Sequence, residues 1–326
     1  MKLTLLLLLP MLVLTAGCGE KEDALAPGTP EPLSLMLDFF PNADHAGIYA
    51  AEAGGHFDDV GLDVEIRQPP DPASPLKFVA SGRVDLAISY EPEVLRARDK
   101  GLAVQAVGAL VQVPLTSIMS LPESGIRSPE DLDGKLVGTA GIDYQSAYLE
   151  SIAKRAGAQV KQRDVGFNLS AALLAKKVDA TLGAFWNYEG TDLRLRGKDP
   201  RIIRMEQAGV PTYDELVVVA NADREDDRIK RFIAALERGT DDLARNPDSG
   251  VDALLEANRD LDPKLQRAVV EVTLPLFQPP RGKPFGWQDP EEWNEFARWM
   301  RDNGLLEQTV DAEGAFTNEY LPGEGP

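Results

Sequence analysis

The chain has 326 residues, of which 43% are hydrophobic and 27% are charged, a composition typical of a soluble globular protein. This length predicts about two domains. The formal net charge is −19, and so acidic a surface repels phosphate backbones, which argues against nucleic acid as a partner.

The N-terminus predicts secretion. Lys2 precedes an apolar run at 3–14 and small residues at 15–17, the pattern of a signal peptide covering 1–17. The run is too short to span a bilayer, which needs roughly 20 residues.

Cys18 is the single cysteine, so no intrachain disulfide can form. Its place directly after Gly17 resembles a bacterial lipobox, although Thr15 stands where an apolar residue is usual. We expect Cys18 to be lipidated, because a free thiol would otherwise be exposed on a secreted protein. The alternative is an ordinary signal peptide followed by a chance cysteine.

Residues 18–32 are rich in charge, Pro and Gly and predict a flexible tether. Strands and helices then alternate, which predicts βαβ units and mostly parallel sheets. The predicted strands are 33–37, 62–66, 85–89, 104–111, 136–138, 160–165, 179–182, 202–205 and 216–220. The predicted helices are 44–53, 76–80, 91–100, 128–132, 144–156, 170–176, 189–196, 226–245, 250–257, 263–275 and 290–303.

The alternation restarts near Ser128, which predicts two lobes. We assign 33–117 and 216–326 to a discontinuous first lobe and 118–215 to a second lobe. The stretches 116–121 and 212–215 are the expected crossovers between them.

Signatures of catalysis are sparse. Neither His45 nor His56 has a second His or Cys at metal-ligand spacing. The nucleophile elbow, the P-loop and the dinucleotide fingerprint are all missing from the sequence. We therefore expect no catalytic residue, no metal and no cofactor.

Polar and aromatic residues follow three predicted strands, where ligands bind in open parallel sheets. The segments are 38–42, 90–91 and 187–189. Together they would form a cleft suited to a flat nitrogen heterocycle, with aromatic stacking worth roughly 1–3 kcal/mol per ring. We expect Tyr90 and Asn187 to share this cleft.

Each of these residues also has a structural interpretation. Phe39, Phe40 and Tyr49 could belong to the core. Asp38 and Asn42 could cap the helix at 44–53 or shape the turn at Pro41. Glu91 and Glu189 could be charges that favour a helix start.

The sequence resembles periplasmic proteins that bind pyrimidine precursors of thiamine for ABC importers. The resemblance rests on LDFFPNADHAGIYAAEAGGHF (37–57) and on the segments 61–66, 79–98, 128–138, 164–190 and 209–220. It covers nearly the whole chain after the tether, although residues 143–148 depart from the pattern. Its less specific motifs are shared with binders of sulfonate, nitrate and riboflavin.

The resemblance implies a type II periplasmic-binding-protein fold, α/β, with two lobes of mostly parallel sheets and a ligand trapped between them. The residues that it places at or near the cleft, together with Trp186 as a further stacking candidate, are Asp38, Asn42, His45, Tyr90, Glu91, Trp186, Asn187, Glu189 and Tyr213.

It also implies a monomer held outside the cytoplasm by its lipid anchor, which closes on a ligand and delivers it to an ABC permease and ATPase. Three alternatives remain. One is a binder of another planar ring such as riboflavin. The second is a thiamine-pyrimidine synthase, an enzyme of the same superfamily with a motif containing His and Cys. The third, a sulfonate or nitrate binder, would need cationic groups in its cleft.

Overall fold

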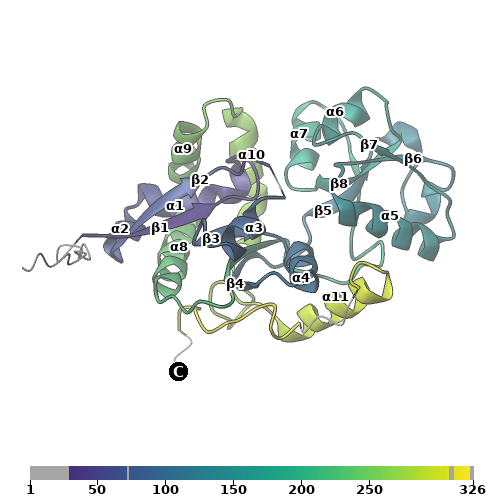
Figure 1. The fold of residues 1–326 in the computed structure, drawn as a ribbon. Helices are drawn as coiled ribbons and strands as arrows, with labels where there is room; N and C mark the ends of the chain where they lie inside the picture. The colour runs from purple at the N-terminus through teal and green to yellow at the C-terminus, as the bar shows by residue number, and fades with distance from the viewer. Residues whose placement is uncertain (1–28, 72, 308–311, 324–326) are drawn as a thin grey trace, which may run out of the picture.

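The computed structural model describes residues 29–71, 73–307 and 312–323. The predicted signal peptide at 1–17, Cys18 and the tether as far as residue 28 lie outside the described residues. The described chain forms two α/β lobes side by side, joined below by extended segments and a C-terminal helix (Figure 1). Each lobe has a five-stranded sheet with helices packed against it.

The first lobe has a sheet of strand order β2-β1-β3-β10-β4. Only β10 runs against the other strands, because it pairs antiparallel with both of its neighbours. The strands of this sheet are β1 (Glu31–Met36), β2 (Leu62–Arg67), β3 (Leu86–Ser89), β4 (Val104–Val111) and β10 (Leu216–Asn221).

The second lobe repeats this plan with the order β7-β6-β8-β5-β9, in which β5 is the antiparallel strand. These strands are β5 (Thr116–Ser120), β6 (Leu136–Thr139), β7 (Lys161–Asp164), β8 (Ala180–Phe185) and β9 (Arg201–Arg204). The predicted fold class, α/β with two mostly parallel sheets, is confirmed.

The helices of the first lobe come from both ends of the chain. They are η1 (Ala43–His45), α1 (Ala46–Ala53), α2 (His56–Asp59), α3 (Pro75–Ala80), α4 (Glu91–Asp99), α8 (Arg228–Arg245), α9 (Pro247–Ala257), α10 (Pro263–Thr273), η4 (Leu274–Leu276) and α11 (Pro290–Asp302). The small residues of α1 let α8 pack very closely, since a Cβ at Gly239 would lie 2.4 Å from the Cβ of Ala51.

The second lobe has η2 (Pro122–Ser124), η3 (Pro129–Leu132), α5 (Asp143–Ala156), α6 (Leu169–Leu174) and α7 (Glu189–Leu195). The short helix predicted at 128–132 is η3, and Ser128 and Asp131 form a capping box at its start. No helix within the described residues has both the length and the apolar character needed to cross a bilayer.

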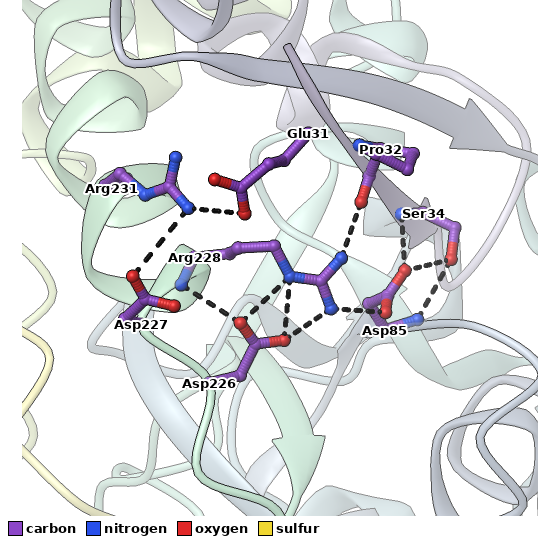
Figure 2. Close-up of polar contacts among 8 residues, drawn as sticks. All are labelled: Glu31, Pro32, Ser34, Asp85, Asp226, Asp227, Arg228 and Arg231. Atoms are coloured by element: carbon purple, nitrogen blue, oxygen red, sulfur yellow. Dashed lines mark hydrogen bonds and ion pairs between the residues drawn. The ribbon is translucent and has the colours of Figure 1, made fainter. Parts of the chain in front are cut away.

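The first strand begins two residues earlier than predicted. Glu31 and Pro32, which were assigned to the tether, belong to β1. Two arginines of α8 hold this start (Figure 2): Arg228 donates to the carbonyl oxygen of Pro32 at 2.5 Å and to Asp85 at 2.9 Å, and Arg231 pairs with Glu31 at 2.9 Å. Partners distant in sequence therefore extend the strand beyond its apolar core.

The prediction of a crossover at 116–121 was wrong. Residues Thr116–Ser120 form β5, which pairs with β8 on one side and β9 on the other. The first crossover is only 112–115, and the second is 205–215. We therefore propose that the second lobe begins at Thr116 rather than at residue 118.

The C-terminal helix α11 makes a third link between the lobes (Figure 1). Trp299 packs edge-on against Tyr148 of α5, with ring centroids 5.3 Å apart. Oγ of Ser151 donates to Oδ1 of Asn303 at 2.7 Å. The end of the chain therefore contacts the second lobe although its sequence follows the first.

Candidate functional site

A cavity of about 530 Å³ lies between the lobes. Its walls come from the ends of strands and the starts of helices in both lobes, the place where open parallel sheets bind ligands. The residues that line it are Asp38, Phe39, Phe40, Pro41, Asn42, Asp44, His45, Gln68, Tyr90, Thr116, Ala140, Ile142, Tyr144, Gln145, Phe167, Leu169, Gly183, Phe185, Tyr188, Glu189, Leu216, Asn258, Asp260 and Leu261.

The segment after β1 is shaped by its own side chains. Oδ1 of Asn42 accepts a hydrogen bond from the amide of Asp44 at 2.9 Å and caps η1. The amide of Asn42 donates in turn to Nδ1 of His45 at 3.2 Å. This contact holds Nδ1 and leaves Nε2 facing Asp38.

Asp38 is the centre of a buried network on the first lobe. Nε2 of His45 donates to its Oδ1 at 2.7 Å, and the hydroxyl of Tyr90 donates to its Oδ2. Burial by itself would raise the pKa of Asp38, but His45 and the hydrogen bonds from His45 and Tyr90 outweigh it, so the pKa lies below its usual value. Asp38 is thus an ionised group that holds Tyr90 against the cavity.

Asp44 connects the two lobes. Nδ2 of Asn187, in the second lobe, donates to Oδ1 of Asp44 at 2.6 Å and to Oγ1 of Thr273 at 2.8 Å. Burial raises the pKa of Asp44 to about 6, although His45 and Asn187 act in the opposite direction. Nearby, Nε2 of Gln266 donates to the hydroxyl of Tyr188 at 3.0 Å. This side of the cavity is therefore sealed by bonds between the lobes.

Glu189 provides the carboxylate on the second lobe. It is the first residue of α7, and its Oε2 accepts from the amide of Phe185 at 2.7 Å. Burial raises the pKa of Glu189 to about 7, despite the bond from Phe185. A carboxylate with one occupied oxygen keeps acceptor capacity for a ligand amine.

Aromatic rings from both lobes meet at the cavity. Phe39 packs on Phe40 and on Phe167, with centroid distances of 4.8 Å and 4.9 Å. Phe40 and Phe167 are 53% and 47% exposed. Tyr144 is buried and also lines the cavity. The site therefore combines flat apolar faces with acidic acceptor edges.

Gln145 of α5 packs directly against Gly183 of β8. Its Oε1 accepts from the amide of Ala140 at 2.8 Å. Gly183 has a φ of +109°, and a Cβ there would lie 2.5 Å from Nε2 of Gln145. Only glycine allows the amide to lie against β8.

Five of the nine predicted ligand-binding residues line the cavity: Asp38, Asn42, His45, Tyr90 and Glu189. The other four do not. Asn187 is fully buried and reaches the cavity only through Asp44, so the expectation that Tyr90 and Asn187 both line one cleft was wrong. Asn187 lies one residue behind the cavity wall, hydrogen-bonded to the lining residue Asp44.

The remaining three hold the crossovers. Oε2 of Glu91 accepts from the amide of Asp214 at 2.7 Å. Nε1 of Trp186 donates to the carbonyl of Pro114 at 3.0 Å. Tyr213, itself in the second crossover, packs on Phe296 with centroids 4.7 Å apart. These side chains are buried, and they contact or belong to the crossovers rather than lining the cavity.

Several lining residues were not predicted. Asp44, Tyr144, Gln145 and Phe167 have no motif of their own that marks them. The departure from the family pattern at 143–148 was the signal that could have identified Tyr144 and Gln145. Phe167 follows β7, and an exposed aromatic residue at a strand end could have been included by the same rule as Phe39.

None of the lining residues is Lys or Arg. Within the described part of the chain, no group of three or more His, Cys, Asp or Glu is arranged to hold a metal ion.

Residues 42–250 match the model of the family described as NMT1/THI5 like. The chain belongs to this family. It is 37% identical over 298 residues to the formylaminopyrimidine-binding protein of Halalkalibacterium halodurans, covering 88% of this chain and 90% of that protein. Among solved structures it resembles the alkanesulfonate-binding protein SsuA from Xanthomonas axonopodis pv. citri, with a TM-score of 0.67, 19% identity and coverage of 89% and 99%. That likeness establishes the periplasmic-binding-protein fold.

Two relatives of this chain with lower identity are named for other functions. The riboflavin-binding protein RibY of Chloroflexus aurantiacus is 28% identical over 90% of this chain and 87% of its own. The 4-amino-5-hydroxymethyl-2-methylpyrimidine phosphate synthase of Legionella pneumophila is 24% identical over 89% and 92%. The names of these relatives therefore include both a binding protein and an enzyme.

Proposed function

We propose that this chain is the extracytoplasmic solute-binding lipoprotein of an ABC importer and captures a pyrimidine precursor of thiamine, of the formylaminopyrimidine or hydroxymethylpyrimidine type. The observation that carries the proposal is the cavity between the lobes, in which aromatic faces meet the carboxylates of Asp44 and Glu189. A relative at 37% identity is named for such a ligand. Cys18 would carry the lipid, and the chain would act as a monomer.

The chemistry of the cavity suits an aminopyrimidine. Rings such as Tyr90 and Phe39 can stack on its face, at roughly 1–3 kcal/mol per ring. The carboxylates can accept from its exocyclic amine, so this donor would not be left unpaired when the ligand is buried. Contacts such as Asn187 with Asp44 form only when the lobes meet, so a bound ligand would favour the closed form. The closed form would dock on a permease driven by an ATPase.

We propose that the chain is not an enzyme. The synthase alternative requires a motif containing cysteine, and the only cysteine is Cys18, directly after the predicted signal peptide. The groups at the cavity have partners that suit binding: His45 is held by Asp38 and Asn42. Ligand recovered unchanged after long incubation with the protein would support this proposal, and a converted product would contradict it.

Riboflavin is the second candidate. A cavity of about 530 Å³ lies within the usual range for small-molecule sites of about 300–1,000 Å³, so it does not select the smaller ring, and a relative at 28% identity is named for riboflavin. The carboxylates on the walls favour the amine-bearing pyrimidine.

Calorimetry and thermal unfolding with four compounds would test the assignment. These are the formylated aminopyrimidine, the hydroxymethyl aminopyrimidine, riboflavin and an alkanesulfonate. At one hundred times the dissociation constant, the true ligand should stabilise the protein by about 2.7 kcal/mol. A response to riboflavin alone would show that riboflavin, not a pyrimidine, is the ligand. A response to the sulfonate alone would show that the cavity binds anions, which contradicts the proposed role of its carboxylates.

A further inference from the structure

Four hydrogen-bond donors beside the cavity donate to carboxylates of the protein. The hydroxyl of Tyr90 and Nε2 of His45 donate to Asp38. The side-chain amide of Asn187 donates to Asp44, and the backbone amide of Phe185 donates to Glu189. These four donors come from both lobes, and each one donates to a carboxylate of the protein itself.

An anionic ligand would have to compete with these carboxylates for such donors, since charged oxygens bind to backbone amides, ring N–H groups and hydroxyls. It would also need a cation, and none of the lining residues is Lys or Arg. In their place the wall carries Asp38, Asp44, Glu189 and the exposed Asp260. Bringing a phosphate beside these like charges would cost several kcal/mol.

We propose that Asp44 and Glu189 act as built-in anions that determine specificity, so that the cleft takes the unphosphorylated pyrimidine and excludes its phosphate ester. This inference rests on the proposed function and narrows its ligand class. It separates this chain from the alkanesulfonate binder of the same fold. The negative charges are present above the pKa of about 6 for Asp44 and about 7 for Glu189.

The pair also explains why exclusion would be a property of the closed cleft. Asp44 lies on the first lobe and Glu189 on the second, and repulsion by Asp44 is among the causes that raise the pKa of Glu189, after burial. A dianion enclosed between them would face repulsion from both sides. A neutral amine would instead donate to both.

The test compares 4-amino-5-hydroxymethyl-2-methylpyrimidine with its phosphate ester by calorimetry at pH 8, using the full chain. The native protein should bind the alcohol at least 100-fold more tightly than the ester. The double variant Asp44→Asn, Glu189→Gln keeps acceptors for Asn187 and Phe185 but loses both charges. Its preference for the alcohol should fall to tenfold or less.

A matched control changes the same charge elsewhere. The double variant Asp199→Asn, Glu206→Gln alters two exposed carboxylates of the second lobe away from the cavity. Its preference should equal that of the native protein. The melting temperature of each variant, compared with that of the native protein, shows that the variant is folded.

The outcomes separate the two proposals. If the native protein binds the ester as tightly as the alcohol, the exclusion is wrong and the pyrimidine function stands. If the Asp44, Glu189 variant keeps the full preference, these carboxylates do not determine it and the inference is overturned. If the native protein binds neither the alcohol nor the formylated amine, the proposed function itself fails.

Discussion

Nε2 of His45 and Oδ1 of Asp38 lie 2.7 Å apart, and both side chains are almost completely buried beside the cavity. The backbone amide of Asn42 holds the other ring nitrogen, Nδ1, at 3.2 Å. Tyr90 also donates to Asp38, so the end of η1 and the residue after β3 are joined through one carboxylate.

Replacing His45 should therefore destabilise the whole first lobe. His45→Ala leaves a buried, ionised Asp38 with one donor fewer, and we expect a loss of about 3 kcal/mol in the free energy of unfolding. Urea denaturation measures this loss. His56→Ala is the matched control, because His56 pairs with the partly exposed Asp242, and it should cost less. Equal losses for the two variants would contradict the role of the buried pair.

Gly183→Ala should damage the wall formed by Gln145. The new Cβ would meet Nε2 at 2.5 Å on a backbone with φ of +109°, so we expect a loss of more than about 2 kcal/mol. Gly157→Ala is the control, since Gly157 also has a positive φ but nothing lies within 4 Å of its Cβ. Similar melting temperatures for both variants would show that contact with Gln145 has no cost.

Phe167→Ala should weaken ligand binding with little effect on stability. Phe167 is 47% exposed, and its contact with Phe39 joins the lobes at the cavity. Losing an aromatic contact costs about 1 kcal/mol, which corresponds to roughly fivefold in affinity. Surface plasmon resonance should show the change in the dissociation rate. Leu195→Ala, an exposed apolar residue of the same lobe, should leave binding unchanged, and an equal effect there would reject the prediction.

Stability should fall as pH rises. Burial raises the pKa of Glu93, Glu189 and Glu215 to about 7 and that of Asp214 to about 8. The folded state then binds more protons than the unfolded state between about pH 5 and pH 8, so stability is greatest at the acidic end and is lost as pH passes the folded pKa values. The lowered pKa of Asp38 acts only at more acidic pH.

Differential scanning calorimetry at pH 5.5 and pH 8 measures this effect, and the melting temperature should be several degrees higher at pH 5.5. Glu93→Gln should reduce the difference, because it removes one of the buried titrating groups. A melting temperature that is constant or increases with pH would refute the expectation.

Much of the fold followed from local pattern. The alternation of apolar runs and amphipathic segments predicted nearly every strand and helix to within a few residues, because hydrophobic period and caps such as Ser128 are local properties. The strand at Thr116–Ser120 and the short helices α2 and η2 were exceptions. A short apolar run becomes a strand only when partners such as β8 and β9 pair with it.

The sequence by itself determined that polar and aromatic residues follow the strands, and Asp38, Tyr90 and Glu189 lie at the cavity for that reason. Only the tertiary structure decided which of their neighbours turn away. Glu91, Trp186 and Tyr213 hold the crossovers, and Phe167 joins the wall from a distant loop. The direction of a side chain depends on the partner that satisfies it, and that partner is brought close by packing of segments far apart in the chain.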